Sequence, residues 1–309
     1  MTDDGLSNRY LVVARVGDRS LHHQWIHPAE DRNFDLFLSY YGNSPGRYAE
    51  ECEFYTACKG TKWQKIHELI ANIEERVFRY DAVWFPDDDI STTPGNISGM
   101  FRLFQEHGLL LAQPALTANS YFKVTAQHID YRLRYTHFVE IMVPIFSRDA
   151  LKACWRTFDK SVTGWGMEHV WAKLLSYPFK KMAILDETPV KHTRLPGQGE
   201  LYENIKNELK IDIWDERNKD VWKEYGIAAP EPSDIGYYDG IKLWDPYAPS
   251  DDVQDHDVQP NQAVSRENHP LAAGRTKHVK RKPPAPRRNR RGNGLRLNRT
   301  VAKREKRRG

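Results

Sequence analysis

The chain has 309 residues, of which 39% are hydrophobic and 12% aromatic, enough to bury the core of one large α/β domain. No window of eighteen uninterrupted apolar residues occurs, which excludes a membrane-spanning helix, and residues 1–9 lack the pattern of a signal peptide. Cys52, Cys58 and Cys154 show no metal-type spacing, which favours free thiols in a reducing, cytoplasmic compartment.

Charge is distributed unevenly along the chain. Residues 275–309 contain 16 Lys or Arg and one acid, about +15, so the remainder must be near −11 to give the total of +4. This predicts an acidic globular body with a basic tail. The tail has no aromatic residue to stack on a base, which favours attraction to the inner face of an anionic membrane. Non-specific binding of nucleic acid and a solubilising role are the alternatives.

Strand-like and helical segments alternate from residue 10 to residue 192. The strand-like runs are short, apolar and β-branched, whereas the helical runs repeat apolar residues every three or four positions. Ser147 is the expected N-cap of one helix. In chain order the patterns predict strand 10–16, strand 34–41, helix 63–78, strand 80–85, helix 97–107, strand 109–115, strand 138–146, helix 147–158, helix 167–175 and strand 182–192.

This alternation indicates βαβ units, and therefore an α/β fold with a mostly parallel, twisted sheet flanked by helices. We predict one domain over residues 1–226 and a C-terminal extension over 227–249 that packs on it. Residues 250–309 are polar, Pro-rich and charged, which predicts a disordered linker followed by the basic tail.

Three consecutive acids, Asp87, Asp88 and Asp89, follow the strand predicted at 80–85. Side chains alternate along an extended chain, so Asp87 and Asp89 face together and Asp88 faces away. In a parallel sheet, the ligand crevice lies beyond the carboxyl ends of the strands. Paired carboxylates there suit Mg²⁺ or Mn²⁺, which keeps positions open for phosphate oxygens. A solvated acidic turn after Pro86 is the alternative.

Two chemistries use such a carboxylate pair. In a phosphatase or phosphotransferase, Asp87 is the nucleophile of a DxDx[ST] pattern, which this segment satisfies through Ser91. In a sugar transferase, the metal holds a nucleotide diphosphate as the leaving group. The phosphatase hypothesis needs a second acidic motif, for which Asp186 and Glu187 are the candidates. A non-catalytic carbohydrate-binding protein is a third hypothesis.

The segment G164-W-G-M-E168 is a second candidate cluster. Its glycines let the backbone approach a ligand, and Trp165 offers a flat face for a sugar ring. Glu168 falls in the first turn of the predicted helix, where a carboxylate can take a proton from an acceptor hydroxyl. The alternative is an ordinary helix start, with Trp165 in the core and Glu168 complementing the helix dipole.

Further candidates lie where predicted strands end and helices begin. His192 ends the last strand and can complete a metal site begun by two carboxylates. Lys59 and Lys62 precede a helix and can offset the charge of a diphosphate. A surface histidine and a solvated basic turn are the alternatives. The nucleotide base and ribose are expected at the exit of the first strand, at residues Ala14, Val16 and Gly17.

These motifs together resemble the GT-A fold of nucleotide-sugar glycosyltransferases and, more closely, the family grouped as domain of unknown function 707. The resemblance implies a GT-A-like, Rossmann-related catalytic domain over residues 1–226 and a sugar-transfer activity, but no substrate. The matching stretches cover residues 10–199 in the family's order: Y10-L-V-V with V16-G17, D87-D-D89, Q113-P-A-L with N119-S120, F138-V-E-I-M-V-P-I-F-S-R148, G164-W-G-M-E168 and D186-E-T-P-V-K-H192.

For the donor side, the resemblance implies that Asp87, Asp89 and His192 hold a Mn²⁺ or Mg²⁺ ion. A nucleotide sugar, with a UDP-sugar favoured, then contacts Asp87 and Asp88 besides the exit of the first strand and the basic turn at 59–62. The metal offsets the charge of the departing diphosphate.

For the acceptor side, the resemblance implies a glycan or glycolipid hydroxyl that Glu168 deprotonates, with inversion at the sugar. A retaining route stays open if Glu168 only positions the acceptor. Plant members carry Asp where this chain has Glu168, and His169 stands where some galactosyltransferases have a second acid, so both residues are candidate bases. Arg148 either shapes the site or stabilises the following helix. The implied acceptor-binding residues are Glu140, Trp165, Gly166 and Glu168.

Overall fold

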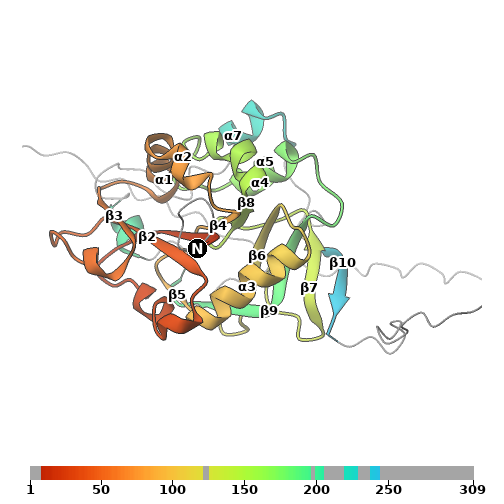
Figure 1. The fold of residues 1–309 in the computed structure, drawn as a ribbon. Helices are drawn as coiled ribbons and strands as arrows, with labels where there is room; N and C mark the ends of the chain where they lie inside the picture. The colour runs from red at the N-terminus through yellow and green to blue at the C-terminus, as the bar shows by residue number, and fades with distance from the viewer. Residues whose placement is uncertain (1–7, 121–124, 196–198, 205–218, 229–236, 244–309) are drawn as a thin grey trace, which may run out of the picture. The chain divides into compact units, whose positions relative to one another are not determined.

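A ten-stranded sheet lies at the centre of the computed structural model, which describes residues 8–120, 125–195, 199–204, 219–228 and 237–243 (Figure 1). Nine strands follow one another in the order β10-β7-β9-β6-β8-β4-β1-β2-β3, and β5 pairs with β9 beside this path. The strands are β1 Tyr10–Val16, β2 Phe34–Tyr40, β3 Phe54–Ala57, β4 Ala82–Trp84, β5 Ile90–Ser91, β6 Leu111–Leu116, β7 Tyr131–Thr136, β8 Ile145–Ser147, β9 Met182–His192 and β10 Tyr237–Lys242.

Most strands on this path run in the same direction. The pairs β1–β2, β1–β4, β2–β3 and β6–β9 are parallel, whereas β8 is antiparallel to both β4 and β6. At the other edge, β7 is antiparallel to β9 and to β10. Among the nine strands of this path, within the described residues, only β7 and β8 therefore oppose the common direction, and β5 beside the path is antiparallel to β9. This confirms the predicted mostly parallel sheet. The carboxyl ends of β1, β4 and β9 consequently lie toward one edge.

Helices cover both faces of the sheet (Figure 1). Helix α3 packs on one face, and α1, α4 and α5 pack on the other. The described helices are α1 Lys62–Asn72, α2 Glu74–Val77, α3 Pro94–Glu106, α4 Arg148–Cys154, α5 Met167–Leu174, α6 Glu200–Asn204 and α7 Lys219–Glu224.

Strand β1 shows why its sequence is continuously apolar. Val12, Ala14 and Val16 belong to the core under α3, whereas Leu11 and Val13 belong to the core under α1, α4 and α5. A strand covered on both faces has no solvent side, so it lacks the alternation of polar and apolar residues that a half-exposed strand shows.

One predicted strand was largely wrong. Of the segment 138–146, only the last two residues are in a strand, as part of β8, and the residues before them form an irregular stretch that lies against the acid triplet. Its carbonyls accept from the loop after β4, with Asp87 N donating to Met142 O at 2.9 Å and Phe85 N donating to Pro144 O at 2.9 Å. The apolar residues are buried as predicted, but their backbone bonds go to a loop.

The predicted helix 63–78 is divided by Ile73 into α1 and α2, and the other predicted elements are present with small changes at their ends. Ser147 caps α4 as expected, because its side chain accepts from Ala150 N. Four strands were missed: β3, β5, β7 and β10. Strand β7 interleaves Arg with apolar residues, and β10 lies at the exposed edge of the sheet.

Several further predictions concern the ends of the chain and the cysteines. No described helix is both long and apolar enough to cross a bilayer. All three cysteines are free thiols. Within the predicted extension 227–249, residues 237–242 form β10 and pair with β7. The predicted linker and basic tail, residues 250–309, lie outside the described residues.

Candidate functional site

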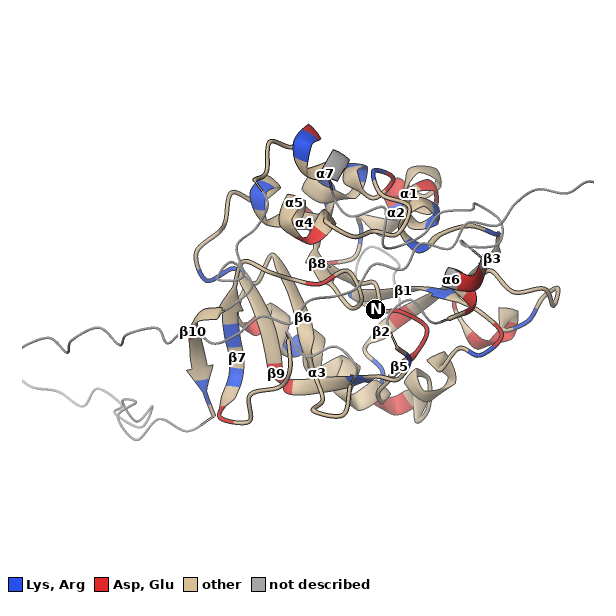
Figure 2. Ribbon diagram, turned by 180° about the vertical axis from the view of Figure 1, so that it is seen from behind, with Lys and Arg blue, Asp and Glu red and all other residues tan. Residues whose placement is uncertain are grey.

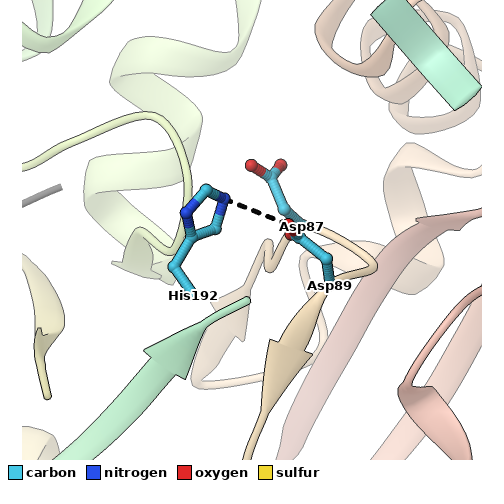
Figure 3. A group of neighbouring side chains, drawn as sticks. All are labelled: Asp87, Asp89 and His192. Atoms are coloured by element: carbon cyan, nitrogen blue, oxygen red, sulfur yellow. Dashed lines mark ion pairs between the residues drawn. The ribbon is translucent and has the colours of Figure 1, made fainter. Parts of the chain in front are cut away.

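Asp87, Asp89 and His192 come together at the carboxyl ends of β4 and β9. Strand β5 follows the acid triplet at once, and its Ile90 pairs with His192 in antiparallel register, which brings Asp89 beside the imidazole. One ligand atom from each of the three side chains lies within 4.8 Å of the others. Figure 3 shows the three side chains converging from the loop after β4 and the end of β9.

The chemistry of this cluster fits a divalent cation. Asp89 Oδ2 lies 3.2 Å from His192 Nε2, and both residues are about 5% exposed. Burial, together with the charges of Asp87 and Asp88, raises the pKa of Asp89 to about 7, and burial lowers the pKa of His192. His192 Nδ1 is buried without a hydrogen-bond partner. Two carboxylates and a neutral imidazole whose Nε2 faces them suit Mn²⁺ or Mg²⁺.

Asp88 faces away from this pair and joins three segments of the chain. Its Oδ2 accepts from Gly17 N and from Tyr41 Oη, both at 2.8 Å, and its Oδ1 accepts from Arg194 Nη1 at 2.8 Å. The ends of β1, β2 and β9 are thereby tied to the acid triplet. With its oxygens engaged in this way, Asp88 stabilises the architecture of the site.

Lys62 lies behind Asp87. Its Nζ donates to Asp87 Oδ1 at 2.6 Å and to the carbonyls of Phe85, Ile141 and Met142 at 2.9–3.0 Å. The side chain is 8% exposed. Lys62 was predicted to face a diphosphate, but its ammonium contacts Asp87, a carboxylate of the triplet.

The other predicted donor residues surround the exit of β1. Ala14 and Val16 are fully buried in the core under α3, so any contact with a nucleotide is left to their backbone. A Cβ built on Gly17 would lie 2.2 Å from Glu200 Oε2 and 2.6 Å from Tyr41 Oη, so this position accepts only glycine without rearrangement. Lys59 Nζ donates to Tyr41 O at 2.8 Å and to Asn43 Oδ1 at 2.7 Å.

Arg194 is a site residue that sequence analysis missed. Its Nη1 donates to Asp88 Oδ1, and its backbone N donates to Asp89 Oδ2 at 3.1 Å. It stands two residues after His192, on the same exit from β9. The available signal was a basic residue two positions after the candidate ligand His192.

The glycines around Trp165 have structural roles. Gly164 has φ +87°, and a Cβ there would lie 2.2 Å from Trp63 Cδ1, so the glycine permits close packing on the indole of α1. Gly166 has φ +93° and stands immediately before α5. Trp165 is half-buried. Gly164 therefore lets the backbone approach the core, whereas the sequence had predicted that it approaches a ligand.

Glu168 turns back over the start of α5. Its Oε2 accepts from Gly166 N at 2.8 Å, which fixes the carboxylate at the helix N-terminus. Burial raises its pKa to about 7. The other candidate base, His169, packs its ring against Phe138 at 5.3 Å and against Trp222 at 5.5 Å between centroids. His169 is thus held in an aromatic cluster, whereas the carboxylate of Glu168 is held at the start of α5.

Glu140 lies in the irregular segment that faces the acid triplet. It is 4% exposed, its backbone N donates to Gln113 Oε1, and its Oε1 accepts from Thr125 Oγ1, both at 2.6 Å. Burial, together with the charges of Glu168 and Asp87, raises its pKa to about 8. The charges of both predicted clusters therefore reach Glu140.

Two other residues of the matching stretches belong to the framework. Arg148 donates to Arg79 O, to Tyr80 O and to Asp81 Oδ1, so it secures the start of α4, the structural alternative that its sequence context left open. Asp186 receives two hydrogen bonds from the guanidinium of Arg134 at 2.8 Å.

The acids of β9 and the arginines of β7 form a paired strip. Arg132 Nε donates to Glu187 Oε2 at 2.8 Å, one residue along from the buried pair of Asp186 and Arg134. Figure 2 shows these basic and acidic bands side by side on β7 and β9. The second acidic motif that a phosphatase would need is therefore engaged in holding two strands together.

The sequence comparisons concern the C-terminal half of this site. Residues 132–226 match the family model described as Protein of unknown function (DUF707). The resemblance to this family is confirmed over those residues. The match contains Glu140, Glu168 and His192, whereas the acid triplet lies before it. A search of curated proteins finds no match.

Solved structures similar to this chain include crystal structures of TarS from S. aureus. TarS 1–349 aligns with a TM-score of 0.43 at 8% identity, over 59% of this chain and 59% of that chain. TarS 1–349 in complex with UDP-GlcNAc aligns with a TM-score of 0.45 at 10% identity, over 63% and 60%. The chain thus spans about three fifths of these structures.

Proposed function

We propose that this protein is a metal-dependent glycosyltransferase that moves a sugar from a nucleotide diphosphate to a hydroxyl acceptor. The observation that carries the proposal is the convergence of Asp87, Asp89 and His192 at the carboxyl edge of a mostly parallel sheet. The DUF707 match supports a common family architecture and supplies no substrate.

In this proposal, each part of the site has a separate task. Asp87, Asp89 and Nε2 of His192, the ring nitrogen that faces the carboxylates, would hold Mn²⁺ or Mg²⁺, and the ion would supply positive charge for the departing diphosphate. Asp88 fixes the backbone at Gly17, and the exit of β1 then lines the nucleotide.

Glu168 is the proposed base for the acceptor hydroxyl. Its pKa of about 7 allows it to accept a proton near neutral pH, and the hydrogen bond from Gly166 N holds its direction. Trp165, next to it, supplies a ring face for the acceptor sugar. Attack from the side opposite the diphosphate inverts the configuration of the transferred sugar.

A thermal-shift screen of UDP, GDP, CDP and their sugars, each with and without Mn²⁺, tests the donor proposal. A ligand that binds the folded state raises Tm by mass action, so one nucleotide class should raise Tm only when Mn²⁺ is present. No shift with any nucleotide would sink the donor proposal and favour a phosphatase or a non-catalytic carbohydrate-binding protein.

Glu168→Gln tests the base. The variant should bind the donor with unchanged affinity and lose transfer by roughly 10²–10⁴-fold, because only proton removal is affected. His169→Gln is the matched comparison and should retain most of the turnover. Retained transfer in Glu168→Gln would contradict the assignment.

A further inference from the structure

Lys62 is a buried cation that shares a carboxylate with the candidate metal site. It is the first residue of α1, and its Nζ contacts Asp87 Oδ1 at 2.6 Å. The side chain is 8% exposed, whereas that of Asp87 is 27% exposed. The ammonium therefore lies on the protein side of the carboxylate, which leaves the outer side of Asp87 open to a ligand.

The charges around this position determine what the site attracts. With Asp87, Asp88 and Asp89 ionised, the three acids carry −3, and Lys62 with Arg194 offsets +2, so the cluster is −1. A divalent cation changes the cluster to +1. Without Lys62 the same two states would carry −2 and 0. The lysine therefore weakens the attraction for a cation and provides the positive charge that attracts an anion afterwards.

We propose that Lys62 is a built-in counter-cation that weakens the site for the divalent cation and strengthens it for the nucleoside diphosphate that binds afterwards. This inference rests on the proposed metal site and assigns a task to a residue beside it. Before the cation binds, the site repels a diphosphate. After the cation binds, Lys62 leaves a net positive charge for the diphosphate.

Lys62 also joins two segments, because its ammonium contacts the carbonyls of Phe85, Ile141 and Met142. A purely structural clamp predicts that its loss disorders the site and weakens every ligand. If Lys62 acts as a counter-cation, its loss changes the two affinities in opposite directions, because the divalent cation then binds more tightly and the diphosphate more weakly. The direction of the change in cation affinity therefore distinguishes the two roles of Lys62.

The experiment uses the full chain and the variants Lys62→Met, which keeps the length without the charge, and Lys62→Arg, which keeps the charge. Lys65→Met is the matched control, because Lys65 lies on the same helix and pairs with Glu68 on the surface. Calorimetry measures the Kd of Mn²⁺ alone, and then the Kd of UDP, GDP and CDP at zero and at saturating Mn²⁺.

The expected result for Lys62→Met is Mn²⁺ binding about tenfold tighter and diphosphate binding about tenfold weaker at saturating Mn²⁺. Lys65→Met and Lys62→Arg should both stay near the wild-type values. Weakening of both ligands in folded Lys62→Met would overturn the inference. If that variant does not fold, loss of both ligands in Lys62→Arg would overturn it. Wild-type protein that binds no Mn²⁺ would instead overturn the proposed function.

Discussion

Two buried aspartates near β9, Asp186 within the strand and Asp89 beside its carboxyl end, illustrate how this fold separates structural from functional charge. Asp186 is 1% exposed and receives two hydrogen bonds from Arg134 and one from His128 N. Asp89 is 5% exposed and faces His192 and the backbone N of Arg194. Asp186 is neutralised by a permanent cation, whereas Asp89 directly follows two further acids, Asp87 and Asp88.

The two acids differ in whether the charge of the carboxylate already has a cationic partner. Arginine keeps its charge at every accessible pH, so Asp186 needs no further ligand. Asp89 has a pKa of about 7 because burial and the neighbouring Asp87 and Asp88 disfavour its charge. Because ionised Asp89 destabilises the folded state, a cation bound beside it is expected to stabilise the protein more than a cation bound beside Asp186.

Substitution of the two aspartates should give the largest difference in the free energy of unfolding. Asp186→Ala leaves the Arg134 guanidinium buried without its partner and should lower the free energy of unfolding by roughly 3–5 kcal/mol. Asp89→Ala removes a buried charge among like charges and should leave stability at pH 8 unchanged or higher. Chemical denaturation of both variants measures the contrast. Equal losses in the two variants would contradict it.

The pH dependence of stability sharpens the comparison for Glu140. Its folded-state pKa of about 8 lies above the usual value, so the folded protein holds this proton more strongly than the unfolded chain. That stability is complete below about pH 4 and is lost as pH rises to about 8. Glu140→Gln stays neutral, so the fall between pH 5 and 8 should be smaller by roughly 2–4 kcal/mol. Unfolding curves at four pH values measure it, and identical slopes would refute it.

A smaller effect is expected at Asp88, which resembles Asp186 in the number of its donors. Tyr41→Phe removes one of them, while Gly17 N and Arg194 remain. The free energy of unfolding should fall by about 1 kcal/mol, and the Mn²⁺ affinity should stay within about twofold. Calorimetric titration checks the affinity. A large loss of Mn²⁺ binding would show that Asp88 contributes more than architecture.

The sequence was informative where one local rule decides the structure. The continuous apolar run of β1, the cap at Ser147 and the alternation through the acid triplet all follow from short-range chemistry. The convergence of Asp87, Asp89 and His192 needed in addition the rule for carboxyl ends of parallel strands. These features together predicted the fold class and the candidate cation site.

The remainder depended on long-range pairing, which a single sequence does not encode locally. The apolar segment before β8 has the composition of a strand, but its carbonyls bond to the loop after β4 and to Lys62. Lys62 itself was expected to face a diphosphate, or solvent in a basic turn, because its four oxygen partners come from segments 23 to 80 residues away and are not visible locally. Gly164 similarly makes room for Trp63, a contact invisible in the local motif.

The most direct measurement of the central claim is Mn²⁺ binding by the full chain. Electron paramagnetic resonance measures it as the loss of the free Mn²⁺ signal. The account predicts one bound ion per chain in the wild type and none in Asp89→Ala, with Asp186→Asn as a matched loss of one carboxylate elsewhere on β9. The Asp186 variant, where folded, should bind like the wild type. Equal Mn²⁺ binding by wild type and Asp89→Ala would contradict the account.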